Sequence, residues 1–178
     1  MKAVSIKIEN TSKPLPRSSF AQTVSALKEK LGENWLPRLY FEKVRSLRTR
    51  SHKLEVDEKE NRTEIQHTLL GVELKIGNLR ISCPDLATAR FLQVFARIGC
   101  SEVAIPYDIT KISVLADELE SSWQRFLLLL EQETVEKTSQ SRSRLRSGLV
   151  KELRLEIAEI GAGEAIPQFR QSTKQRQT

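Results

Sequence analysis

The chain of 178 residues has 39% hydrophobic and 29% charged residues, and its 29 Lys and Arg against 23 Asp and Glu give a formal net charge of +6. This balance supplies the apolar side chains of one ordinary domain and excludes wholesale disorder, which goes with fewer apolar residues and more uncompensated charge. The basic excess favours a polyanionic partner, because Lys and Arg side chains close to phosphates release counterions.

The sequence also bears on where the chain resides. Its first residues lack the apolar run of an export signal, and the longest apolar run, Phe126 to Leu130, is far too short to span a membrane. Cys83 and Cys100, the two cysteines of the sequence, are therefore expected to be reduced thiols. We predict a cytoplasmic protein without a membrane partner.

Residues 1–55 are predicted to form a strand and two helices with a basic face. Alternating apolar residues indicate a short strand over residues 4–8. Apolar residues at helical spacing then indicate a helix over residues 18–31. A second helix is expected to begin at Asn34 and to end at about Ser51.

Residues 56–67 are charged and rich in turn-forming residues, and they are predicted to be a linker or a long exposed loop. The α+β core is expected over residues 68–136. Within this core, two alternating apolar runs on either side of Gly77-Asn78 predict a β-hairpin over residues 72–83.

A helix and a strand are predicted to follow this hairpin. Pro84 and Asp85 are typical of the start of a helix, Gly99 is typical of its end, and a short strand is expected over residues 102–105. This order gives a β-β-α-β unit. If the two strands that flank the helix are parallel, their crossover is right-handed.

Next comes a long helix, predicted to run from Asp108 or Thr110 to about Val135. Its apolar residues recur three and four positions apart, and its second half is apolar nearly all round. A helix end of this kind is expected either to be buried or to meet a partner.

Residues 137–163 are predicted to hold a polar loop and then a basic amphipathic helix from Arg144 to Ile160. Residues 164–178 are expected to be a polar tail that is disordered until bound. The predicted fold class is therefore α+β, a small sheet packed by amphipathic helices and extended by two C-terminal helices.

Two basic segments are candidate nucleic-acid contacts. In the predicted second helix, Arg38, Arg45 and Arg48 would share one face and could straddle phosphates, while Trp35 and Tyr40 could stack on unpaired bases. At the start of the last helix, serine and arginine alternate in a pattern that could clamp a phosphate backbone. A solvated charged face is the simpler interpretation of both segments. The candidate residues are Arg38, Lys43, Arg45, Arg48, Arg50, Lys53, Arg142, Arg144, Arg146 and Lys151.

A protein–protein adaptor or oligomerising module, with a protein partner or a second copy, is the alternative hypothesis. This function would use the helix over residues 112–130, whose second half offers the largest apolar surface. The candidate interface residues are Trp123, Phe126, Leu128 and Leu130.

A third hypothesis is a small metal-dependent phosphotransfer enzyme or nuclease. Asp85 and Asp108 would both follow strands, and side chains at the carboxyl ends of parallel strands gather into sites. Both residues are also ordinary helix caps, which explains them without any chemistry.

Other motifs give no support to catalysis. The sequence has no glycine-rich nucleotide loop and no hydrolase nucleophile motif, and its two His and two Cys lack the short paired spacing of a zinc site. Cys83 is interpreted as a buried structural thiol. We therefore predict a non-catalytic nucleic-acid-binding or accessory protein with no cofactor, no metal and no identifiable catalytic residue.

Overall fold

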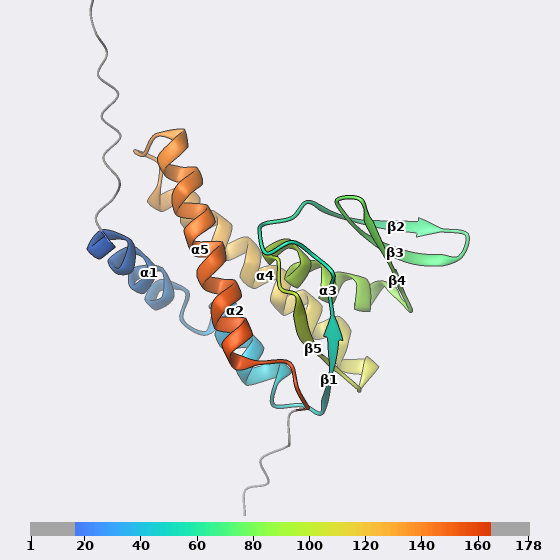
Figure 1. Ribbon diagram of the computed structural model, residues 1–178. Coiled ribbons are helices and arrows are strands. Elements are labelled where there is room, and N and C mark those ends of the chain that lie inside the picture. Colours follow the sequence, from blue (N-terminus) through green and yellow to red (C-terminus); the bar gives the residue numbers. More distant parts are fainter. Residues whose placement is uncertain (1–16, 165–178) are drawn as a thin grey trace, which may run out of the picture.

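The computed structural model describes residues 17–164, so the predicted strand over 4–8 and the predicted tail lie outside the described residues. The chain adopts an α+β fold in which helices pack against two small antiparallel sheets (Figure 1). The helical elements are α1 (Arg17–Leu31), η1 (Gly32–Asn34), α2 (Leu36–Leu39), η2 (Tyr40–Val44), α3 (Leu86–Ile98), α4 (Ile109–Glu133) and α5 (Ser139–Ile160). The strands are β1 (Thr49–Lys53), β2 (Thr63–Thr68), β3 (Gly71–Ile76), β4 (Leu79–Cys83) and β5 (Glu102–Pro106).

The second predicted helix is much shorter than expected. After α2 the chain passes into one π-helical turn, η2, and helical structure ends at Val44 rather than at Ser51. The residues from Thr49 onward form β1, which pairs along its whole length with β5. The propensities of these five residues are mixed, and a strand partner that lies far along the chain decides their structure.

The predicted hairpin over residues 72–83 is confirmed as β3 and β4, with Gly77 in the left-handed region at φ +57°. A third strand, β2, pairs antiparallel with β3, so the end of the predicted linker is a strand and not a loop. In this sheet Leu74 lies between Ile65 and Ile81, and the face that carries them packs on α3. The opposite face is polar, as expected for an antiparallel sheet covered on one side.

Strand β5 follows α3, as predicted, but it does not join the hairpin. It pairs antiparallel with β1 in a separate two-stranded sheet, so the parallel crossover is absent. The other edge of β5 is closed by a side chain, because the Ala104 N–H donates to the Tyr40 hydroxyl at 2.9 Å. Tyr40 in turn donates to the Gly161 carbonyl at 2.8 Å, which ties the end of α5 to the core.

The ends of α3, α4 and α5 follow local rules. Asp85 caps α3 by accepting from the Thr88 N–H at 2.7 Å, and Asp108 caps α4. Gly99 ends α3 at φ +85°, where the backbone of residues 57–59 leaves no room for a Cβ atom. Helix α5 begins at Ser139, earlier than predicted, because Thr138 caps it.

Buried side chains form one core that runs through the described chain. Helices α1 and α5 lie at one end of the molecule and the three-stranded sheet at the other, while α4 runs behind them and packs along α3 (Figure 1). Trp35, Trp123 and Phe126 pack together in the helical end, and Tyr40 packs on Phe95 beside the strands. Within residues 17–164, no helix is long and apolar enough to cross a membrane.

Candidate functional site

The first basic segment does not form one basic helical face. Because helical structure ends at Val44, Arg38 belongs to α2, whereas Arg45 and Arg48 lie in the loop before β1 and Arg50 lies on β1 itself. The predicted row of guanidinium groups at helical spacing is therefore absent.

In the first part of this segment, up to Arg45, the cations are bound by the protein itself. Arg38 donates to Glu42 at 2.9 Å, Lys43 pairs with Glu118 at 2.9 Å, and Arg45 donates to a backbone carbonyl beyond the end of α5. Lys43 and Arg45 thus join distant segments, and all three side chains are less available to a phosphate than a free cation would be.

The aromatic residues predicted to stack on bases are buried. Trp35 donates from its indole nitrogen to Glu156 at 2.8 Å, and the Tyr40 hydroxyl is held between β5 and the end of α5. Two aromatic side chains of the described chain reach the surface near this segment, Phe41 on η2 and Tyr107 after β5, and no sequence pattern pointed to Tyr107. The Arg48 guanidinium lies over its ring, 5.1 Å from the ring centre.

Strand β1 and the loop residue before it carry the exposed cations of the first segment that are not neutralised within residues 17–164. Arg48, Arg50 and Lys53 are exposed, and none of them forms an ion pair among residues 17–164. We refer to these three residues with Tyr107 as the β1 patch.

The second basic segment forms the first turns of α5 and continues to Lys151. Arg142, Arg144 and Lys151 are exposed and form no ion pair in the described part of the chain. Arg146 differs, because it donates from Nε to Glu60 at 2.9 Å and through a second nitrogen to the same carboxylate. This bidentate pair raises the pKa of the Arg146 guanidinium and fixes its position beside α4.

Three of the four candidate interface residues belong to the core. Trp123, Phe126 and Leu130 are buried, and the first two rings stack at 5.4 Å. Leu128 points away from them and is 59% exposed. The core therefore buries the leucine-rich half of α4 except on the side of the helix that carries Leu128.

An open groove of about 570 Å³ lies along the exposed side of Leu128, between the second half of α4 and the first turns of α5. Three leucines of α4 line it, and polar and charged side chains from both helices surround them. We call this feature the α4/α5 groove. Its lining residues are Gln124, Leu127, Leu128, Leu130, Glu131, Thr134, Arg142, Ser143 and Arg146.

The groove owes its shape to the short connection between its two helices. Thr134 ends α4 by donating its hydroxyl to the Leu130 carbonyl at 2.8 Å, and Thr138 caps α5 by accepting from the Ser141 N–H. Leu128, a candidate interface residue, therefore lines the same groove as Arg142 and Arg146, which are candidate nucleic-acid contacts.

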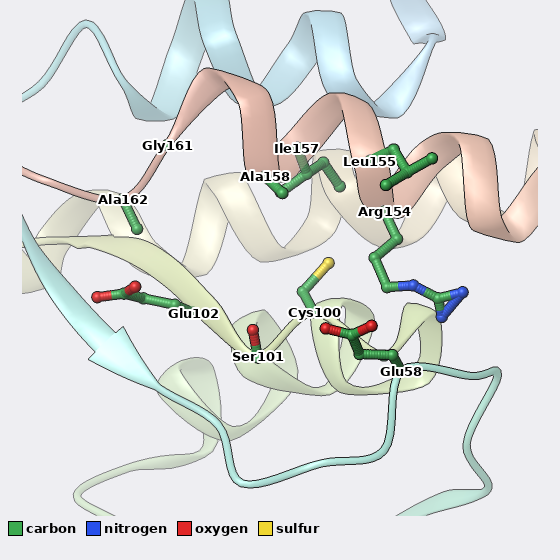
Figure 2. Close-up of a pocket in the computed structure, with 11 residues that line it drawn as sticks. Glu58, Cys100, Ser101, Glu102, Arg154, Leu155, Ile157, Ala158, Gly161 and Ala162 are labelled. Carbon is green, nitrogen blue, oxygen red and sulfur yellow. The ribbon is translucent and has the colours of Figure 1, made fainter.

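A smaller cavity of about 190 Å³ lies under the second half of α5 (Figure 2). Arg154 reaches into it from α5 and Glu58 from the loop below, and the Cys100 thiol lies beside them and points toward α5 (Figure 2). Arg154 donates to the Ile98 carbonyl at 3.3 Å, where a cation offsets the carbonyl dipoles at the end of α3. Burial raises the pKa of the Cys100 thiol to about 12, so at neutral pH it is not the thiolate that nucleophilic chemistry needs.

The residues of the enzyme hypothesis lie apart in the fold. Asp85 and Asp108 follow β4 and β5, which belong to different sheets, and each caps the helix that follows it. Cys83 is buried, and burial raises the pKa of its thiol as well. In residues 17–164 no three His, Cys, Asp or Glu side chains are grouped so that they could hold a metal ion.

Comparison of the chain with protein-family models, with curated proteins and with solved structures gives no match. Function must therefore be inferred from the surfaces described above.

Proposed function

We propose that this protein is a non-catalytic protein-interaction module whose docking site is the α4/α5 groove. The observation that carries this proposal is the position of Leu128, a largely exposed leucine on the wall of an open groove with two further leucines beside it. A docking site needs an apolar centre that loses its water and a polar rim that fixes the register of the partner. The groove has both.

The geometry favours a helical occupant. The groove runs between two helices, and amphipathic helices of a partner can lay their apolar stripes against its leucines with their polar flanks against the charged walls. Burying the exposed part of Leu128 would contribute on the order of 1–2 kcal/mol. Single exposed leucines are ordinary on protein surfaces, so it is the combination with the groove, and not Leu128 alone, that supports docking.

Site-specific photo-crosslinking tests this proposal. A benzophenone amino acid would replace Leu128 in one variant and Leu155 in a matched control, which is 54% exposed but lines the separate cavity under α5. After irradiation in the cells that naturally produce the chain, we expect one discrete protein adduct from position 128 and none from position 155. Equal labelling at both positions, or none at position 128, would remove the support for a docking groove.

A second candidate function, nucleic-acid binding, is favoured by the β1 patch. The guanidinium of Arg48 already lies over the half-exposed ring of Tyr107, and Arg50 and Lys53 extend the positive charge along the strand. An exposed aromatic ring beside free cations is an arrangement used to bind single strands without sequence preference.

Fluorescence polarisation with labelled single- and double-stranded DNA and RNA tests this second function across a salt series. Replacing Arg48 and Arg50 together by Ala should weaken binding and lower the salt slope by about two, since each phosphate contact contributes about one. Arg38→Ala is the matched control, because Arg38 is held by Glu42. Absence of binding at low salt would exclude the β1 patch as a nucleic-acid surface.

A further inference from the structure

We infer that the occupant of the α4/α5 groove is a second copy of this chain, bound about a two-fold axis. The inference rests on the proposed function and names its partner. It follows from the charges on the two walls of the groove, which have opposite signs and come from different helices.

The acidic wall belongs to α4 and the basic wall to α5. Glu131 lines the groove from α4, while Arg142 and Arg146 line it from α5. Arg146 is held by Glu60, but neither Glu131 nor Arg142 takes part in an ion pair among the described residues. The groove therefore offers one free anion and one free cation to whatever enters it.

This distribution selects among occupants. An acidic helix would be repelled by Glu131, a basic helix would be repelled by Arg142, and a nucleic-acid backbone would meet a carboxylate beside the leucines. A surface that carries both signs on opposite sides of an apolar strip is complementary to its own copy. Self-complementarity of this kind is the requirement for a closed two-fold interface.

The two-fold arrangement follows from the antiparallel helices. An axis along the groove lays α4 of one copy over α5 of the other, so Glu131 meets Arg142 of the second copy and Arg142 meets Glu131 of the second copy. Each charge contact is thus made twice. Leu128 and Leu127 of both copies lie between the two contacts, where loss of water is most complete.

Exchanging the charges tests the inference on the purified full chain. Light scattering after size exclusion, over a concentration series, should show a dimer for the wild type. Glu131→Arg and Arg142→Glu should each weaken dimerisation by about tenfold or more, because each variant places like charges together twice. Mixing the two variants in equal amounts should restore a dimer. Positions 131 and 142 are both basic in the Glu131→Arg variant and both acidic in the Arg142→Glu variant, so opposite charges meet at both contacts.

Matched control variants distinguish this interface from non-specific association. Glu136→Arg and Arg144→Glu change the same charges at exposed positions that do not line the groove, and they should leave the dimer unchanged. Leu128→Glu should give a monomer. Leu70→Glu, in the fully exposed turn between β2 and β3, should not. Far-UV circular dichroism checks that each variant is folded.

The outcomes distinguish this inference from the proposed function. If the wild-type chain stays monomeric at all concentrations, the inference that a second copy occupies the groove is wrong. A foreign protein crosslinked at position 128 would in that case still support the docking groove. A dimer that survives Leu128→Glu and both charge exchanges overturns the groove as its interface. Variants that separate but do not recombine on mixing overturn the two-fold arrangement.

Discussion

Removal of the Tyr40 hydroxyl should destabilise the fold more than its single oxygen atom suggests. This hydroxyl accepts a hydrogen bond from the Ala104 N–H at 2.9 Å and donates one to the Gly161 carbonyl at 2.8 Å. It therefore joins η2, β5 and the end of α5 at one buried point. Tyr40→Phe keeps the aromatic packing on Phe95 and removes the two hydrogen bonds.

The two partners of this hydroxyl differ in what they lose. The Ala104 N–H is fully buried on the edge of β5 that faces away from β1, so without Tyr40 it has no acceptor, at a cost of about 1–3 kcal/mol. Gly161 is only partly buried, so its carbonyl can turn to water and loses about 1 kcal/mol or less. The expected total is about 1–4 kcal/mol, or a fall in Tm of roughly 2–16 °C.

Urea and thermal denaturation measure this loss directly. Tyr107→Phe is the matched control, because the Tyr107 hydroxyl makes no hydrogen bond in the described part of the chain and its ring is 48% exposed. The control should lie within about 0.5 kcal/mol of the wild type. If both variants lose the same small amount, the hydroxyl of Tyr40 does not hold β5 and α5 together.

Three further changes test separate parts of the fold. Gly99→Ala should cost about 2 kcal/mol or more in thermal denaturation, because φ is +85° and a Cβ atom would lie 2.7 Å from the Lys59 nitrogen; a normal Tm would contradict this. The free energy of unfolding should fall as pH rises above 9.0, the ordinary pKa of the Cys100 thiol, toward its raised pKa of about 12, because the unfolded chain then releases this proton first. The slope is at most about 1.4 kcal/mol per pH unit, and Cys100→Ala should flatten it in urea titrations. Leu130→Ala should cost about 2–5 kcal/mol and Leu128→Ala under about 1 kcal/mol, and equal losses would show that the leucine run is oriented differently.

Local signals in the sequence predicted the elements whose causes are local. The hairpin follows from Gly77-Asn78 between alternating runs, and the ends of α3 follow from Asp85 and Gly99. Strand β1 could not be predicted in this way. Its residues favour a helix as well as a strand. Pairing with β5 decides between the two, and no local sequence pattern indicates this pairing. The same cause explains why β5 does not join the hairpin.

The candidate site was predictable in part. Charge runs in the sequence locate the cations, but the carboxylates that neutralise some of them come from distant positions, as in Lys43 with Glu118 and Arg146 with Glu60. Sequence spacing alone could not tell which cations remain free. The exposure of Leu128, in contrast, could be predicted from the sequence. Phe126 and Leu130 are four positions apart on one helical face, and Leu128 lies about 200° of rotation from each.

The two proposed surfaces can be combined in one further prediction. If the chain dimerises through the α4/α5 groove, each dimer presents two β1 patches, and a nucleic acid that reaches both would bind more tightly through avidity. Glu131→Arg then separates two explanations, because it raises the charge of each chain from +6 by two units while it weakens the dimer. If net charge alone determines affinity, this variant binds a long single strand more tightly than the wild type in fluorescence polarisation. If avidity dominates, it binds more weakly, and mixing it with Arg142→Glu restores the affinity. A short oligonucleotide that covers only one patch should show no such loss, whereas equal loss on short and long strands would rule out avidity as the cause.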